Sequence, residues 1–111
     1  IGLPFGSTGG PIVARQSALR EAGFNAIPDD HAGFLRLCQE LRRINKPAGF
    51  ALGNAVGDGN AFCNWLIWSH GAFLVAEDGS VAINSRETIA ALNYLRQLYP
   101  TQTVRRPESA N

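Results

Sequence analysis

The fold is decided by residues 57–99, which read GDGNAFCNWLIWSHGAFLVAEDGSVAINSRETIAALNYLRQLY. The first part of this stretch predicts a helix over residues 60–70, because its aromatic residues recur every three positions. Gly71 follows and is expected to end that helix, since glycine readily adopts the left-handed conformation found after a helix. The stretch therefore starts with a helix that is unusually rich in aromatic residues.

A hairpin and a second helix are predicted in the rest of the stretch. Asp78 and Gly79 lie between the apolar runs FLV and VAI, which indicates a hairpin turn because glycine accepts a positive φ. Asn84 or Ser85 is expected to cap the last helix, with Glu87 placed for a capping box. The core-facing stripe of that helix is expected to be Ile89, Leu92, Leu95 and Leu98, with Tyr94 and Tyr99 on its flanks.

Upstream, the pattern predicts two short buried strands and two more helices. The strands are expected at residues 11–14 and 49–52, and the helices at residues 15–22 and about 30–44. Gly23 is expected to end the first of these helices. The second is capped by Asp29 or Asp30 and carries an apolar stripe of Phe34, Leu37, Cys38, Leu41 and Ile44. This order predicts an α/β or α+β layer in which helices pack on a small sheet.

Composition limits the class of protein. The chain has 111 residues, 45% of them hydrophobic, and a net charge of +1. That length and apolar content fit one compact domain, and the charge argues against nucleic acid or an anionic membrane as a partner. No apolar run is long enough to span a bilayer. Cys38 and Cys63 are interpreted as buried free thiols rather than a disulfide. Because the chain begins at Ile1, without Met or signal peptide, we interpret it as a segment of a longer protein.

The loop GDGN and the helix after it form the best candidate binding site. The first turn of a helix presents unpaired backbone N–H groups, and Asp58, Gly59 and Asn60 add polar groups beside them. Phe62 and Trp65 follow and offer flat apolar faces. A sugar needs both features, because its hydroxyls require hydrogen bonds and its C–H face packs on aromatic rings. The alternative is that these aromatic residues only fill the core.

Other kinds of site have weaker signals. The loop GSTGG at residues 6–10 lacks the Gly-Lys-Ser/Thr ending of a nucleotide-binding loop, although Ser7 and Thr8 could line a cleft. No metal-ligand spacing is present, so neither a metal nor another cofactor is expected. Cys63 and His70 lie two helical turns apart, about 10 Å, which is too far for proton transfer. We therefore expect a protein that is not an enzyme.

Two alternative functions remain open at this point. One is a small hydrolase or transferase that uses the GDGN loop, and it requires a catalytic pair within about 3 Å. The other is an interaction module whose exposed aromatic helix contacts a protein partner. Such an exposed face would also allow the chain to associate with itself.

The order of three runs resembles a known family. The runs are PIVARQSALREAGF, DDHAGFLRLCQELRRINKPAGFALG and the stretch from residue 57 to residue 99. In this order they resemble the extracellular solute-binding proteins of ABC sugar transporters, over nearly the whole chain from Leu3 to Tyr99. The resemblance implies a two-lobed periplasmic binding protein of type II. Residues 1–10 would be the crossover between lobes, residues 11–100 part of the C-terminal lobe, and residues 101–111 a truncated tail.

The resemblance also implies a function and site residues. Members of the family bind a sugar in the periplasm and deliver it to a membrane permease. The family's polar contact and stacking residue correspond to Asn60 and Phe62, with Trp65 next. The chain departs from the family at residues 14–17, where Ala-Arg-Gln-Ser replaces Tyr-Asn-Lys-Asp, and at Ala72, where the family has a second glycine. Because the other lobe would supply part of the site, this chain alone is expected to bind sugar weakly.

Overall fold

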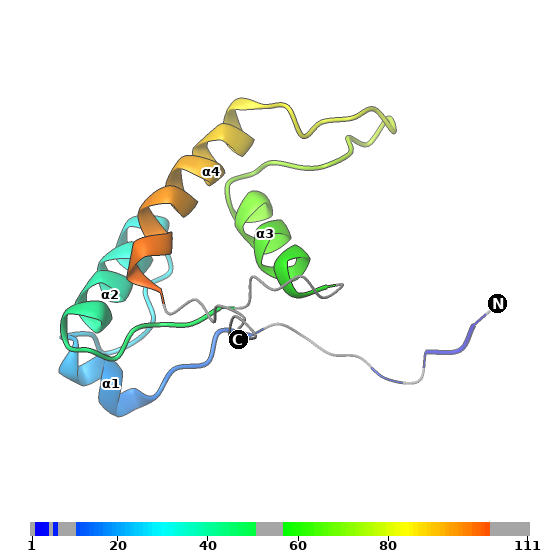
Figure 1. Ribbon diagram of the computed structural model, residues 1–111. Helices are drawn as coiled ribbons and strands as arrows, with labels where there is room; N and C mark the ends of the chain where they lie inside the picture. Colours follow the sequence, from blue (N-terminus) through cyan, green and yellow to red (C-terminus); the bar gives the residue numbers. More distant parts are fainter. Residues whose placement is uncertain (1, 5, 7–10, 51–56, 103–111) are drawn as a thin grey trace, which may run out of the picture.

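In the computed structural model of the chain, the described residues are 2–4, 6, 11–50 and 57–102 (Figure 1). This part of the chain forms a small helical body. Its elements are α1 (Gln16–Glu21), α2 (His31–Arg43), α3 (Asp58–Ser69), α4 (Arg86–Leu98) and the 3-10 turn η1 (Tyr99–Thr101). Figure 1 shows α4 passing between α2 on one side and α3 on the other. None of the helices in the described ranges is long and apolar enough to cross a membrane.

The expected sheet is absent from the described residues, so the predicted α/β or α+β fold, including a lobe of the type II binding-protein kind, is wrong. In the hairpin, the described residues pair through a single antiparallel bridge, between Val75 and Val81. Ile12 and Val13 lie in extended chain but are 48% and 86% exposed. An apolar run becomes a strand only when a neighbouring strand pairs with its backbone, and residues 11–14 have no such partner in this part of the chain. Of the second predicted strand, residues 51 and 52 lie outside the described ranges.

The ends of α1 and α2 were predicted correctly because local signals set them. Gly23 has φ +88°, and the backbone N–H of Phe24 donates to the Leu19 carbonyl at 2.8 Å, which closes α1. At the start of α2, the Asp30 carboxylate accepts a hydrogen bond from the backbone N–H of Gly33 at 2.5 Å. This contact satisfies one of the four unpaired N–H groups of the first turn.

The cap of α4 is Ser85, but its partner is not the predicted Glu87. Ser85 Oγ accepts from the backbone N–H of Thr88 at 3.2 Å, and the two hydroxyl oxygens lie 3.0 Å apart. With Ser85 at the cap, Thr88 occupies the third helical position and Glu87 only the second. The reciprocal contact of a capping box comes from a side chain at the third position, which Glu87 does not occupy.

The buried face of α4 is rotated from the predicted stripe. Ile89 and Leu92 are 57% and 55% exposed, whereas Ala91 and Tyr94 are buried. Small Ala91 lies in the same core cluster as Leu66 and Ile67 of α3, and its size lets the two helices approach closely. The core of the described residues comprises two clusters, one of Cys38, Leu66, Ile67, Ala72, Ala91, Tyr94 and Leu98 and one of Leu19, Ala22 and Leu37.

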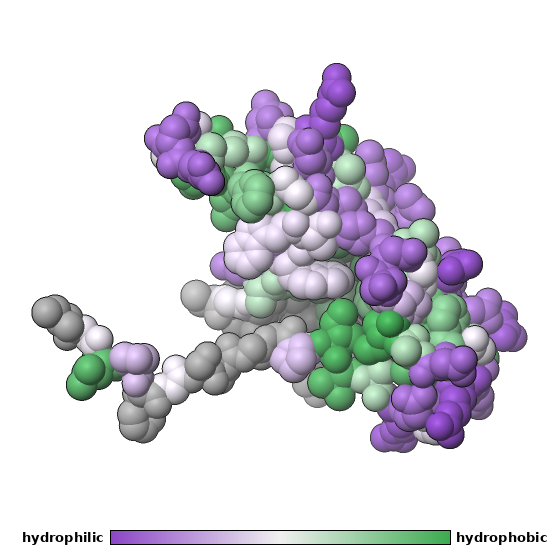
Figure 2. Space-filling model, turned by 180° about the vertical axis from the view of Figure 1, so that it is seen from behind, coloured by the Kyte–Doolittle hydropathy of each residue, from purple (hydrophilic) through white to green (hydrophobic). Residues whose placement is uncertain are grey.

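The predicted hairpin turn is present between α3 and α4. Gly79 has φ +85°, and Asp78 Oδ1 accepts from both the backbone N–H and the hydroxyl of Ser80, at 2.9 and 2.6 Å. These bonds lower the pKa of the Asp78 carboxyl. The hairpin projects from the helical body, as Figure 2 shows at the upper left. Its exposed apolar residues are Phe73, Leu74, Val75, Val81 and Ile83.

Gly33 provides a test of the packing at the start of α2. A Cβ at this position would lie 2.6 Å from Pro28 Cβ and 2.7 Å from Asp30 Oδ1. We therefore expect Gly33→Ala to lower the free energy of unfolding by about 1–3 kcal/mol, as overpacking does. Urea unfolding followed by circular dichroism measures this. If Gly33 were unhindered, its replacement by alanine would instead raise the free energy of unfolding by about 1 kcal/mol, because alanine favours the helix. Such a rise would contradict the close packing of Gly33 against Pro28 and Asp30.

Candidate functional site

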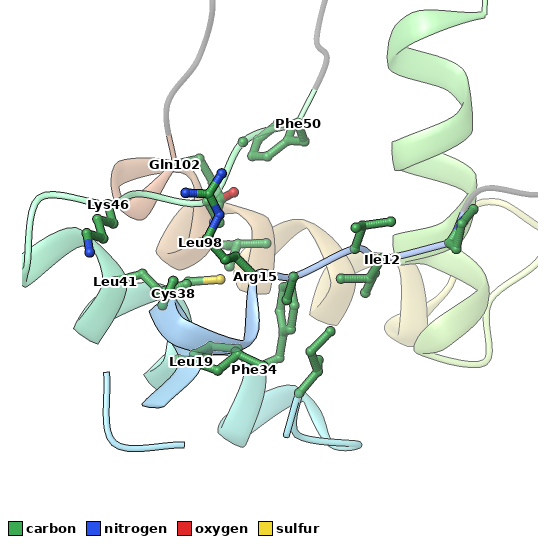
Figure 3. Close-up of a pocket in the computed structure, with 18 of the residues that line it drawn as sticks. Ile12, Arg15, Leu19, Phe34, Cys38, Leu41, Lys46, Phe50, Leu98 and Gln102 are labelled. Atoms are coloured by element: carbon green, nitrogen blue, oxygen red, sulfur yellow. The ribbon is translucent and has the colours of Figure 1, made fainter. Parts of the chain in front are cut away.

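The helical body contains an apolar cavity of about 430 Å³. Figure 3 shows Leu19, Leu41 and Leu98 gathered around the Cys38 sulfur, with Phe34 and Ile12 farther toward α3. The residues lining this apolar cavity are Pro11, Ile12, Val13, Ala14, Arg15, Ala18, Leu19, Ile27, Phe34, Leu37, Cys38, Leu41, Lys46, Ala48, Gly49, Phe50, Ala61, Phe62, Trp65, Leu98 and Gln102. The segment before α1, the length of α2 and the start of α3 thus enclose it.

Polar groups are few in the apolar cavity. The cations there are Arg15 and Lys46, and Lys46 pairs with the Glu21 carboxylate. Burial raises the pKa of the Cys38 thiol, against the opposing effect of hydrogen bonds from Gln102 and Thr101. A neutral buried thiol is a poor nucleophile and a poor metal ligand. Such a lining suits apolar packing better than the hydroxyls of a sugar.

A second depression, the polar cleft, lies between the start of α2 and the C-terminal half of α3. Its volume is about 450 Å³. Two carboxylates, an imidazole, a hydroxyl and an indole line it, among apolar groups that make up most of the lining surface. The residues lining the polar cleft are Ile12, Pro28, Asp29, Asp30, His31, Phe34, Trp65 and Ser69. Trp65 lines both the apolar cavity and the polar cleft, as do Ile12 and Phe34.

The Trp65 ring is held by two aromatic neighbours. Phe34 of α2 contacts it edge-on, with ring centroids 6.0 Å apart, and Phe62 lies one helical turn before it at 5.6 Å. Edge-to-face and tilted contacts of this kind stabilise a fixed ring orientation. Phe62 is itself stacked on Phe50, with centroids 4.1 Å apart and planes within 6°. One face of Phe62 is therefore occupied, which makes Trp65 the better candidate for stacking on a ligand.

One pair in the polar cleft meets the distance expected of a catalytic pair. His31 Nε2 lies 2.9 Å from Ser69 Oγ. However, the Ser69 hydroxyl donates a hydrogen bond to the Leu66 carbonyl at 2.7 Å, so its oxygen accepts a hydrogen bond from His31 Nε2–H. A general base must instead accept the proton of its nucleophile. In this arrangement the pair joins two helices and does not activate Ser69.

The predicted site residues are dispersed. Gly59 and Asn60 lie in the first turn of α3 with Asp58, and neither lines the apolar cavity or the polar cleft. Asn60 and Trp65 are five residues apart on a helix, which places them on different faces. Phe62 lines the apolar cavity, and Trp65 lines both spaces. The predicted residues Ser7 and Thr8 lie outside the described residues, as does most of the loop before α3.

The polar residues around Trp65 were missed from the sequence. The sequence pattern indicates Asp29 and Asp30 only as candidate helix caps, and Asp30 does have this role. Ser69 and His31 are separated by 38 positions, so no local pattern connects them. The spacing of Trp65 and Ser69 does indicate that they are neighbours, because residues four apart lie on the same face of a helix.

Neither a cluster of metal-ligating side chains nor a disulfide occurs in this part of the chain. Among the described residues, no group of three His, Cys, Asp or Glu side chains lies close enough to hold a metal ion. Cys38 and Cys63 are both free thiols; Cys38 is buried, as predicted, whereas Cys63 is only half-buried. His70 Nδ1 lies 2.9 Å from the Leu66 carbonyl oxygen and donates to it.

Comparison with known proteins found no matching protein-family model, curated protein or solved structure.

Proposed function

We propose that the chain binds a carbohydrate in the polar cleft, as part of the substrate-binding component of an ABC sugar transporter. The observation that carries this proposal is the position of Trp65 beside Asp29, Asp30 and Ser69 in one cleft. An indole ring packs against the C–H face of a sugar, while carboxylates accept hydrogen bonds from its hydroxyls. The ordered resemblance of the three sequence runs supports the same class of ligand.

The properties of the polar cleft fit a small polar ligand. Its volume of about 450 Å³ lies within the range of small-molecule sites, about 300–1,000 Å³. The Asp29 carboxylate is exposed at its edge, and Asp30 directs one oxygen to Gly33. Phe34 holds the Trp65 ring in place before any ligand arrives, which reduces the entropic cost of binding. The site is open to solvent at Asp29 and Asp30, so we expect weak binding by this chain alone.

The proposal is tested by titrating the chain with glucose, galactose, xylose and maltose, followed by isothermal titration calorimetry, which needs no tryptophan as a reporter. Trp65→Leu is expected to weaken binding several-fold, because an aromatic stacking contact contributes about 0.5–1.5 kcal/mol. Trp68→Leu is the matched control, since Trp68 lies on the same helix, is 56% exposed and lines neither space. It should leave the affinity unchanged.

Two results would contradict the proposal. The first is that none of the four sugars binds even at millimolar concentration. The second is that Trp65→Leu and Trp68→Leu bind sugar equally well while both remain folded, since Trp65 would then contribute only to the core.

A further inference from the structure

Two imidazole rings stack where three helices meet. The ring centroids of His31 and His70 are 3.9 Å apart and their planes lie within 10°. His31 begins α2, and His70 is the residue that caps the end of α3. Tyr94 of α4 contacts both rings at 5.1 and 5.3 Å, and its hydroxyl donates to the His31 carbonyl at 2.7 Å. The pair therefore joins the start of α2 to the end of α3, across α4.

Hydrogen bonds determine which nitrogen of each ring carries a proton in the neutral state. Ser69 Oγ donates to Leu66, so it accepts from His31 Nε2–H. His70 Nδ1 faces the Leu66 carbonyl oxygen, which only accepts, so His70 Nδ1 carries a proton as well. In His31 the remaining nitrogen, Nδ1, is left to take up a proton at lower pH. Acid therefore leaves these hydrogen bonds intact and adds positive charge to stacked rings.

We infer that the stacked His31–His70 pair is a proton-sensitive clasp, which holds α2 against α3 while His31 is neutral and loosens when His31 takes up a proton against the His70 ring. Two imidazolium rings at this separation repel each other, and neither could move away without breaking the stack. The clasp is one of few links between these helices in the described residues, beside the Ser69 hydrogen bond and the Phe34–Trp65 contact.

The groups around the pair do not cancel this repulsion. From the α2 side, Asp30 favours a charged His31, and Asp29 lines the same cleft. From α3 the neighbour is the neutral hydroxyl of Ser69. From α4 the neighbour is Tyr94. Its pKa is raised to about 12, mainly by burial, so its hydroxyl stays neutral. Asp30 can offset one positive charge, and its Oδ1 is already bound to the Gly33 N–H.

The direction of the pH effect follows from His31. Burial lowers the pKa of His31, His70 lowers it further, and Asp30 opposes both. The unfolded chain then binds this proton more readily than the folded chain does. The stabilisation is complete above the ordinary histidine pKa of about 6.5 and is lost as the pH falls from there through the lower folded pKa.

The clasp also affects the polar cleft, a consequence that rests on the proposed function. Asp29, Asp30 and His31 come from the α2 side of the joint, while Trp65 and Ser69 come from α3. Separating the two helices would move the carboxylates away from the indole ring. Sugar would then bind several-fold more weakly in acid, which would make release depend on pH.

The clasp is tested by following the ring protons of both histidines by NMR from about pH 8 to about pH 5. The chain has two histidines, so the assignment is direct. In His70→Phe, which keeps an aromatic ring but no charge, the midpoint of His31 should move upward toward the ordinary value. The midpoint of urea unfolding should also depend less on pH. Ser69→Ala is the control, because it removes a hydrogen bond but keeps the stack and its coupled titration.

The proposal of a clasp is contradicted if the titration midpoint of His31 is the same in the wild-type chain and in His70→Phe. If His70→Phe does not fold, His70→Gln serves for the same comparison, since it also removes the second charge. Fluorescence titrations with the four sugars at about pH 7.5 and about pH 5.5 separate the two proposals. Absence of binding at both values contradicts the proposed function. Binding that is equal at both values, when His70→Phe does shift the midpoint of His31, contradicts the link between clasp and cleft.

Discussion

Leu98→Ala is expected to lower the free energy of unfolding by about 2–5 kcal/mol, as other large-to-small changes in a core do. Leu98 is fully buried near the end of α4, in the cluster that also contains Cys38 of α2 and Leu66 of α3. It also lines the apolar cavity, so the lost side chain enlarges a space that already exists. Because a domain of this size is stable by only about 5–15 kcal/mol, the loss is a large fraction of the total.

Chemical denaturation in urea, followed by helical circular dichroism, measures this effect. Leu92→Ala is the matched control, because Leu92 lies on the same helix but is 55% exposed. We expect a change of no more than about 0.5 kcal/mol there, as for most surface substitutions. Equal losses at Leu98 and Leu92 would contradict the orientation of α4.

Leu66→Ala is expected to have a similar cost, about 2–5 kcal/mol, but a more local consequence. Leu66 is 1% exposed and, together with Ile67, brings α3 into the main core cluster. Without it, α3 keeps its contacts at Ile67 and at the His31–His70 stack, but loses its largest fully buried side chain. The helix should therefore open more often than the rest of the body, taking Trp65 out of the polar cleft.

Amide hydrogen exchange resolves this difference by helix. In Leu66→Ala the amides of α3 should exchange much faster than in the wild-type chain, with a smaller change in α2. Trp68→Ala, on the exposed side of the same helix, should leave the exchange of α3 nearly unchanged. Uniform acceleration in all four helices would argue that α3 does not open separately.

The helix ends were predictable because short-range chemistry sets them. Asp30 and Ser85 each accept from a backbone N–H three residues later, and Gly23 supplies a positive φ just after α1. Each of these signals involves residues within a few positions of one another, so the sequence contains them in full. The turn at Gly79 belongs to the same group.

The layer architecture and the buried face of α4 were not predictable in this way, because they depend on partners far along the chain. The stripe from Ile89 to Leu98 has good helical spacing, yet Ala91 and Tyr94 are the residues that face α3 and α2. Hydrophobic periodicity favours large apolar side chains, whereas close helix packing at Ala91 requires a small one. In the same way, the apolar run at residues 11–14 indicates a strand only if another strand is available to pair with it.

Only part of the candidate site, the aromatic side chain of Trp65, could be predicted from the sequence. Trp65 could be identified because aromatic residues on a helix after a polar loop fit a stacking role. Its polar partners could not, since Asp29 and Asp30 lie more than thirty positions earlier and are brought to Trp65 by the packing of α2. The predicted partner Asn60 lies on another face of α3, because residues five apart on a helix do not align.

The most direct test of the central claim is an NMR titration of the two indole N–H signals with sugar. The chain has two tryptophans, so this region of the spectrum contains one signal for Trp65 and one for Trp68. Carbohydrate binding in the polar cleft predicts that glucose, galactose, xylose or maltose shifts the Trp65 signal in a saturable way and leaves the Trp68 signal in place. A saturable shift of Trp68 alone, or no shift of either signal, would contradict the proposal that Trp65 and the carboxylates beside it bind sugar.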